Sequence, residues 1–415
     1  MKKLLPIILV FVVVSLINVT LVGCSSNKTS TTATTTSGTA SLQEATVLIG
    51  TDSPLTGPAS PWGLSVEHGV QLAFDDVNAA GGLTVGNTHY TFKVISLDDQ
   101  FDTATATNNI RQLVYQNGCK YIFTMQSEGT LATAAEMSQQ KILDFSCVDN
   151  DQVISQPANS YVFRTYDPFS LQATAYFKWL LTQYPDAKTV GLITTNSDNG
   201  LAIEDQEKAG AQANGLTFLD TVLYDSGTKD FTPFLTKMLA EKPDILTFTG
   251  APTGDCAVLV KTAFDMGYKG HIALSTDAAS DMLPIAGEAA LEGVTDTNLA
   301  MQAPYVTSTV LGLPAREVAK WGASYVSTWD FYSQALIMFD AMKAANSVDT
   351  TAVKTILQDP TREWTYAALS GGLATFDSPM AQQWFGANAT NQILDAWAIC
   401  KIHNGQDFIA TIINP

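Results

Sequence analysis

Short apolar runs alternate along most of the chain with longer stretches in which apolar residues recur at helical spacing. The first run, residues 47–50, follows a polar tract and predicts a buried strand of the parallel type. Val66, Val70 and Phe74 then recur every four positions, which predicts a helix that packs one face on that strand. The glycine pair at 81–82 ends the helix, because glycine readily adopts the positive φ that follows many helices.

The segment between this strand and this helix, residues 53–63, is rich in proline and glycine and predicts a loop. A loop at the carboxyl end of a parallel strand lies where open α/β sheets hold their ligands. Trp62 belongs to this loop. It is therefore a candidate wall of a ligand site, the alternative being a packing anchor of the loop itself.

The same strand–loop–helix unit repeats along the chain. Further strands are predicted at residues 90–97, 120–125, 142–146, 162–165, 190–195, 216–224, 244–249 and 272–275. Helices are predicted near residues 110–117, 130–140, 171–184, 203–214, 231–240, 256–266, 329–344 and 351–357. The last segments, 371–376, 392–402 and 408–413, return to strand-like patterns, with Asn404 and Gly405 as a hairpin turn.

Two successive α/β series predict two doubly wound α/β lobes. The later segments are too few for a third lobe, so we expect them to complete the first two and to cross between the lobes as a hinge. Lobe 1 is predicted at 46–168 and 298–375, and lobe 2 at 169–297 and 376–415. The ligand site is expected in the cleft between the lobes.

The amino terminus predicts export. Lys2 and Lys3 precede an apolar run, and residues 1–23 are typical of a secretory signal. Residues 21–24 resemble a bacterial lipobox, which implies cleavage before Cys24 and acylation of its sulfur, the alternative being a transmembrane anchor. Residues 24–45 are mostly serine and threonine and predict a flexible tether, because they contain too little apolar area to fold.

Composition narrows the possible partners. A net charge of −18 with only 22 lysines and arginines argues against nucleic acid, since phosphate contacts need a basic face. Hydrophobic residues make up 46% of the chain, enough for sizeable cores. No other apolar run is long enough to span a membrane.

Cysteine and histidine spacing predicts neither a metal nor a cofactor. Cys119, Cys147, Cys256 and Cys400 contain no CxxC pair, the four histidines are scattered, and the glycines form no nucleotide-binding motif. Cys119 precedes one predicted strand and Cys147 follows the next, so a disulfide would have to reach across opposite strand ends. We therefore expect free, buried thiols.

Several short sequence blocks follow one another along the chain. They read GTDSPLTG at 50–57, WG at 62–63, GV at 69–70, DVNAAGG at 76–82, DD at 98–99, QLV at 112–114, FRT at 163–165, KDF at 229–231 and FDMG at 264–267. In this order they resemble the leucine/isoleucine/valine-binding protein family, the extracellular receptors of branched-chain amino-acid-type ABC importers. The resemblance implies the type I periplasmic binding protein fold, in which three hinge segments join two lobes around a ligand.

The resemblance also implies roles for individual residues. Trp62 matches the tryptophan that flanks the ligand in the first loop. Ser127 matches the serine after the third strand whose hydroxyl holds the ligand carboxylate. Asp277 matches the acidic residue of the second lobe that pairs with the ligand ammonium.

Five further candidates mark departures from the family pattern. Asp149 and Asn150 occupy a loop where relatives have a small residue and a threonine. Asn199 and Thr253 stand near positions that are usually aromatic, and Glu128 is an added charge beside Ser127. For Ser127, Asp149 and Asn150, a helix cap or loop hydrogen bond is the alternative role, and for Glu128 it is a solvated charge. A helix N-terminus in this cleft would suit a carboxylate.

Together these observations predict an extracellular substrate-binding lipoprotein of an ABC importer, and not an enzyme. It would be a lipid-anchored monomer outside a bacterial cell membrane that captures an amino acid or related ligand and delivers it to a membrane permease. One alternative is a sensor that feeds a signalling receptor. The other is a cell-surface hydrolase, suggested by SxxK at 138–141 and SDN at 197–199, although no Lys-Thr-Gly element follows.

Overall fold

The computed structural model describes most of the chain after residue 41. The described residues are 42–148, 150–166, 169–275, 278–299, 312–325, 327–359, 362, 364–365, 382–383, 391 and 397–413. They belong to one compact unit, Leu42–Pro415. No helix in these ranges combines the length and the apolarity needed to cross a membrane.

The first sheet has six strands in the order β2-β3-β1-β4-β5-β6. Its strands are β1 (Gln43–Ser53), β2 (Leu83–Val85), β3 (Thr88–Asp98), β4 (Tyr121–Thr124), β5 (Leu143–Ser146) and β6 (Val162–Arg164). All neighbours pair in parallel except β2, which forms an antiparallel edge with β3. The carboxyl ends of β1, β3, β4, β5 and β6 therefore meet at one edge of the sheet.

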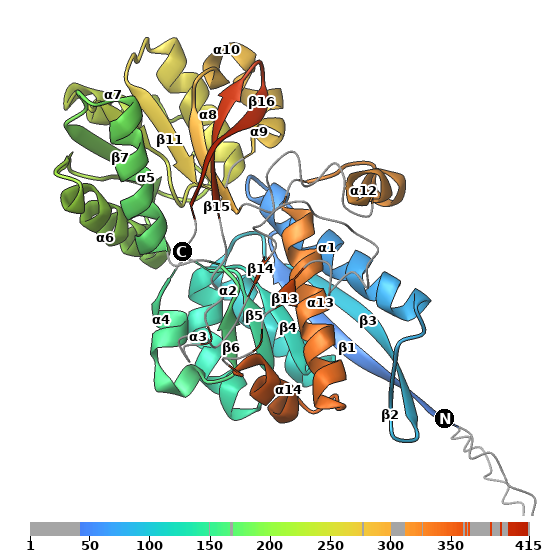
Figure 1. The fold of residues 1–415 in the computed structure, drawn as a ribbon. Helices are drawn as coiled ribbons and strands as arrows, with labels where there is room; N and C mark the ends of the chain where they lie inside the picture. The colour runs from blue at the N-terminus through green and yellow to red at the C-terminus, as the bar shows by residue number, and fades with distance from the viewer. Residues whose placement is uncertain are drawn as a thin grey trace, which may run out of the picture. The chain divides into compact units, whose positions relative to one another are not determined.

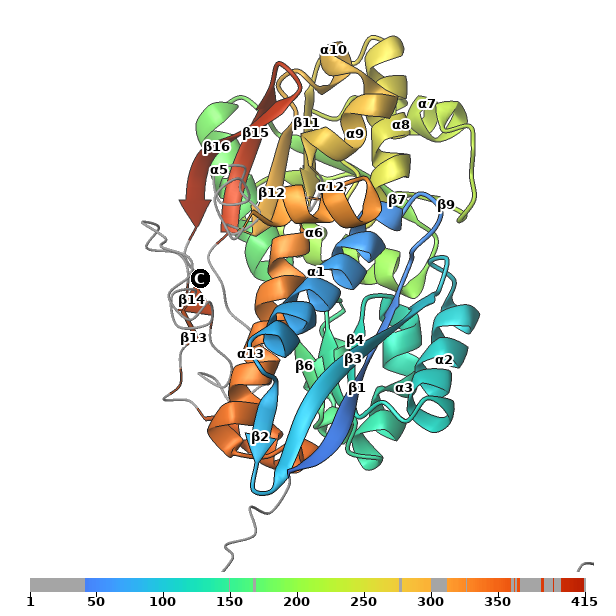
Figure 2. The same ribbon diagram turned by 90° about the vertical axis from the view of Figure 1, so that its right-hand side faces the viewer.

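Helices cover both faces of the first sheet (Figures 1 and 2). One face carries α1 (Ser60–Ala79) and α13 (Thr328–Ala345), whose apolar side chains share a core with Ile49 and Phe123. The other carries α2 (Thr103–Arg111), the π-helical turn η1 (Gln112–Gln116) and α3 (Ser127–Gln139). Their core includes Leu48 and Ile122, because successive side chains of a strand point to opposite faces. Shorter helices are α4 (Gln152–Ser155), η2 (Pro157–Asn159) and α14 (Thr350–Leu357).

The second sheet has eight strands in the order β16-β15-β12-β11-β10-β7-β8, with β9 paired to β7. Its strands are β7 (Thr189–Thr195), β8 (Thr217–Phe218), β9 (Val222–Tyr224), β10 (Ile245–Thr247), β11 (His271–Ser275), β12 (Thr295–Leu299), β15 (Trp397–His403) and β16 (Gln406–Ile413). β15 is antiparallel to β12 and forms a hairpin with β16. Positive φ angles at Asn404 and Gly405 confirm the predicted hairpin turn.

Helices also cover both faces of the second sheet. One face carries α5 (Phe169–Gln183) and α6 (Asp198–Ala213). The other carries α7 (Thr232–Ala240), α8 (Thr253–Asp265), α9 (Ala279–Ala286) and α10 (Glu288–Leu291). The apolar side chains of Leu192 and Ile193 enter these two cores separately, as the alternation of a strand requires.

Along the described elements, the chain passes from one sheet to the other three times. The connections run from β6 to α5, from β12 to α12 (Leu313–Trp321), and from α14 to β15. α12 lies against α1, where Arg316 pairs with Asp76 at 2.6 Å. Two helix-covered sheets with three connections confirm the predicted two α/β lobes. A small ladder pairs β13 (Trp364–Thr365) with β14 (Gln382–Gln383).

Several boundaries differ from the prediction. β1 begins at Gln43, inside the predicted tether, because backbone pairing with β3 continues back to that residue. α1 begins at Ser60 despite Pro61, since proline is tolerated in the first helical turn. The stretch 216–224 forms two short strands and not one. The predicted strand at 371–376 lies outside the described residues.

Cysteine chemistry agrees with the prediction of free thiols. Cys119, Cys256 and Cys400 are buried thiols outside any disulfide, whereas Cys147 is a thiol outside any disulfide that is only half-buried. Burial raises the pKa of the Cys119 thiol to about 11, so it stays protonated and unreactive at neutral pH.

Candidate functional site

A cavity of about 310 Å³ lies where the carboxyl ends of strands from both sheets meet. It is lined by Trp62, Gln100, Phe101, Asp102, Thr103, Met125, Gln126, Ser127, Glu128, Cys147, Tyr166, Thr195, Asn196, Ser197, Asn199, Ser226, Gly250, Ser327, Asp330 and Phe331. Most of these residues directly follow β3, β4, β5, β6, β7, β9 or β10. Open α/β sheets bind ligands at these strand ends, which makes the cavity the candidate functional site.

Trp62 lines the cavity, but it is the third residue of α1 and does not belong to a loop. Its ring meets Phe101 edge to face, with ring centroids 6.0 Å apart. The indole Nε1 is buried and has no hydrogen-bond partner among the described residues. The side chain therefore offers an aromatic surface at the cavity wall, while its indole N–H is buried without a partner.

The start of α3 forms a second part of the wall. Gln126 precedes the helix, and its Oε1 accepts a hydrogen bond from the Gly129 N–H at 2.5 Å. Ser127 and Glu128 are the first two helical residues, although a loop was predicted there. Ser127 is buried and is not the N-cap, the role that Gln126 takes.

Glu128 links the two sheets directly. Its Oε1 accepts from the Asn199 backbone N–H at 2.9 Å, and its Oε2 accepts from Gln126 Nε2 at 2.6 Å. Asn199 is the second residue of α6, so the carboxylate sits at the positive end of that helix. A second link joins the Gly254 N–H of α8 to the Pro58 carbonyl at 3.0 Å. Glu128 thus has a defined structural role beyond that of a solvated charge.

The start of α6 is further satisfied by Ser197. Its Oγ accepts a hydrogen bond from the Gly200 N–H at 3.1 Å, a standard N-cap. Asp102 caps α2 in the same way, accepting from the Thr105 N–H at 2.8 Å. The side-chain hydrogen bond from Thr105, the largest influence, holds the pKa of the Asp102 carboxyl below its usual range.

The structure brings four of the eight predicted ligand-site residues together at the cavity: Trp62, Ser127, Glu128 and Asn199. Asn150 does not line it, and its Oδ1 accepts from the Gln152 N–H at 2.9 Å in a turn. Thr253 is buried at the start of α8 and does not line it either. Asp149 and Asp277 lie outside the described residues.

Sequence reasoning missed several wall residues. Phe101, Asp102 and Tyr166 follow strands β3 and β6, so their position after a strand was an available signal. Asp330 and Phe331 lie in α13, where every residue from 328 to 338 is buried. A helix buried on all sides shows no special position in its sequence pattern, so no local signal marked these two residues.

The described cavity wall contains acidic side chains but no basic ones. It includes the carboxyl groups of Asp102, Glu128 and Asp330, and none of the described wall residues is lysine, arginine or histidine. The buried guanidinium of Arg164, at the end of β6, pairs with Asp151 at 2.5 Å and does not line the cavity. In the part of the chain that the structure describes, no group of His, Cys, Asp and Glu is arranged to hold a metal ion.

The hydrolase motif is not assembled at this cavity. Ser138 lies in the last turn of α3, and its Oγ accepts from the Tyr161 N–H at 3.1 Å. The nucleophilic serine of an SxxK motif would have to open a helix. Ser197 lines the cavity as the N-cap of α6.

Two α/β lobes with a cavity at the carboxyl ends of their strands define the type I class of periplasmic binding fold. The chain belongs to the periplasmic binding protein family, whose sequence profile matches residues 46–407. This is a family of extracytoplasmic binding proteins and not of enzymes, which confirms the resemblance drawn from the sequence blocks.

Individual relatives agree with this assignment. A Leu/Ile/Val-binding protein of Rhizobium johnstonii is 24% identical over 325 residues, covering 77% of this chain and 85% of the relative. The fold is similar to a branched-chain amino-acid ABC transporter structure from Thermus thermophilus with bound valine. That match has a TM-score of 0.75 and 17% identity, and covers 90% of this chain and 98% of the other.

A second structure extends the range of ligands found on this fold. It is a solute-binding protein of an ABC transporter from R. palustris in complex with 4-hydroxybenzoate. It has a TM-score of 0.70 and 17% identity, and covers 89% of this chain and 97% of the other.

Proposed function

We propose that this protein is the substrate-binding component of an ABC importer, capturing a small organic ligand between its lobes and delivering it to a membrane permease. The observation that carries the proposal is the cavity of about 310 Å³ at the carboxyl ends of strands from both sheets. Membership of the binding-protein family supports the same function. The relatives named above bind amino acids or another small organic compound.

Trp62, Ser127, Glu128 and Asn199 are the ligand-contacting residues of this proposal. Trp62 supplies an aromatic wall, and Ser127 supplies a hydroxyl at the start of α3. Glu128 and Asn199 join the two lobes across the cavity. Asp149 and Asp277 remain candidates from the sequence.

Binding is expected to favour the closed arrangement of the lobes, because a ligand that contacts both gains most when they approach. The mature protein should therefore carry its ligand through purification, and mass spectrometry of denatured protein should release one small molecule. Small-angle scattering should then show a smaller radius of gyration when that molecule is added back. Absence of any released compound, together with an unchanged radius in extracts of growth medium, would argue against the function.

Trp62→Ala tests the wall directly. Loss of an aromatic wall removes roughly 1.5–3 kcal/mol of buried apolar contact, which is about 10- to 140-fold in affinity for the released compound. Trp179→Ala is the matched control, because Trp179 is half-buried on α5 and does not line the cavity. Equal affinities of the two variants would exclude Trp62 from the site.

We further propose that Cys24 bears a lipid that anchors the protein outside the cell membrane, with residues 24–42 as the tether that leads into β1. The support is the lipobox-like sequence at 21–24. Cys24→Ser should abolish partitioning into a detergent phase, whereas Thr32→Ala, in the same tether, should leave it unchanged. A Cys24→Ser protein that still partitions would refute lipidation at this residue.

A further inference from the structure

We infer that the cavity selects a small organic ammonium ion with an apolar body and no free carboxylate. This inference rests on the proposed function and specifies the ligand of the same site. It separates this chain from the solved relatives named above, since valine and 4-hydroxybenzoate both carry a carboxylate.

The first argument is the charge of the wall. The carboxyl groups of Asp102 and Glu128 line the cavity, and the described wall contains no basic side chain. The buried cation at Arg164 is paired with Asp151 away from the cavity. A ligand carboxylate would therefore meet like charge in a partly desolvated site, whereas an ammonium would be attracted.

The second argument concerns three backbone N–H groups at the starts of α3 and α6, a kind of group that can hold a carboxylate. The Gly129 N–H of α3 donates to Gln126, and the Gly200 N–H of α6 donates to Ser197. The Asn199 N–H donates to Glu128. The protein thus places its own carboxylate at the start of α6, and a ligand carboxylate would have to displace it.

The third argument is the aromatic lining. Trp62, Phe101, Tyr166 and Phe331 all contribute to the same wall. Aromatic faces bind organic cations through their ring quadrupole, and they also cover an apolar body.

Matched pairs of compounds test the inference on the purified mature protein. The probes are isopentylamine against leucine, phenethylamine against phenylalanine, and choline against glycine betaine. Within each pair the apolar or cationic body is shared, and only the first member lacks a carboxylate. Titration calorimetry should show that the carboxylate-free member of at least one pair binds about tenfold or more tightly than its partner.

Two variants remove charge and keep shape. Asp102→Asn preserves a good N-cap for α2, and Glu128→Gln preserves the length of the side chain. Each substitution should lower the affinity for the amine by about fivefold or less, as expected for partly exposed charges, and the double variant should lower it by about tenfold. The affinity of the carboxylate-bearing partner should stay level or rise, whereas a merely structural loss would weaken both members of the pair equally.

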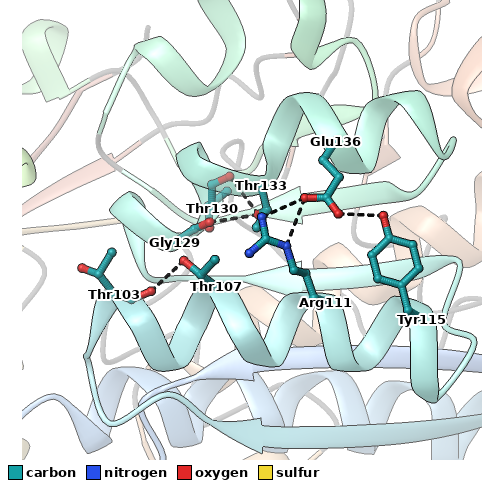
Figure 3. Close-up of polar contacts among 8 residues, drawn as sticks. All are labelled: Thr103, Thr107, Arg111, Tyr115, Gly129, Thr130, Thr133 and Glu136. Carbon is teal, nitrogen blue, oxygen red and sulfur yellow. Dashed lines mark hydrogen bonds and ion pairs between the residues drawn. The ribbon is translucent and has the colours of Figure 1, made fainter.

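Glu136→Gln is the control for the charge change. Glu136 belongs to the same helix as Glu128, but it faces Arg111 and Tyr115 and does not line the cavity (Figure 3). Removal of the Glu136 charge should leave unchanged the ratio of the affinities for the carboxylate-free and the carboxylate-bearing member of each pair. The same ratio in Glu128→Gln and wild type would overturn the electrostatic argument.

Two other results would also overturn the inference: carboxylate-bearing members that bind as tightly as their partners in every pair that binds, or no binding by any of the six probes. Tighter binding of an acid leaves the proposed function standing, because the protein would still capture a small ligand. Failure of the proposed function is recognised separately, by the absence of a co-purified compound and of lobe closure.

Discussion

Three buried carboxyl groups near the carboxyl end of β1 make stability depend on pH, and Asp52→Asn tests this dependence. The Asp52 side chain is fully buried, and its Oδ1 accepts a hydrogen bond from Asn109 at 2.9 Å. Burial, followed by the neighbouring charge of Asp99, raises the Asp52 pKa to about 9. Burial also raises the pKa values of Asp99 and Asp144 to about 7.

The direction of the change in stability with pH depends on which state, folded or unfolded, holds the Asp52 proton. The pKa of Asp52 in the folded protein lies above its ordinary value of 3.8, so the folded state keeps a proton that the unfolded chain releases. The free energy of unfolding therefore falls as pH rises from about 4 to about 9. Between these pH values the folded state binds about one proton more at Asp52 than the unfolded chain does. The free energy of unfolding therefore falls by about 1.4 kcal/mol per pH unit, or roughly 2.7 kcal/mol between pH 5 and pH 7 for Asp52 alone.

Urea unfolding at pH 5 and pH 7, followed by tryptophan fluorescence, measures this difference. Asparagine has nearly the shape of a protonated aspartic acid and can still accept from Asn109. We therefore expect the fall in unfolding free energy between these pH values to be smaller by about 2–3 kcal/mol in Asp52→Asn.

Asp205→Asn, at an exposed position of α6, is the control and should retain the wild-type pH dependence. Identical pH dependence in Asp52→Asn and wild type would refute the account, because Asp52 would then be ionised in the folded protein.

Two further substitutions test the packing of α1, each by its urea midpoint. Gly69→Ala should destabilise by about 1–3 kcal/mol, since the added Cβ would lie 2.4 Å from the Thr328 carbonyl oxygen of α13. Glu67→Ala, also in α1, should have little effect, and equal midpoints for the two would contradict the close approach. Glu317→Ala should cost about 3–5 kcal/mol, because this buried carboxylate pairs with His68 Nδ1 at 2.8 Å. An effect below about 1 kcal/mol would mean that the pair contributes little.

Much of the fold was predictable because most strands and helices have a characteristic local pattern of apolar residues. Period-two runs and helical stripes located most strands and helices, and positive φ at Gly81 and Gly82 confirmed the expected end of α1. Several of the differences fall at helix starts. α1, α3 and α6 each begin a few residues before their apolar stripe, because the first turn of a helix can be made of polar residues or proline, which the apolar pattern does not mark.

The candidate site was predictable only in part. Trp62 was found because it follows a strand, where ligands bind in open α/β sheets, whereas Ser127, Glu128 and Asn199 were found through the family resemblance and the departures from it. Asp330 and Phe331 could not be found in this way. They belong to a helix buried on all sides, and only its packing against the first sheet brings them to the cavity.

The sequence by itself therefore determined the repeating strand–loop–helix units, the buried face of each element and the loops that could carry a ligand. The tertiary structure decided which of those loops meet. Glu128 and Asn199 are 71 residues apart and become hydrogen-bonded partners only when the two sheets bring their carboxyl ends together. Apolar periodicity fixes which side of an element is buried, but the order of strands and the pairing of lobes depend on contacts distant in sequence, which no local pattern encodes.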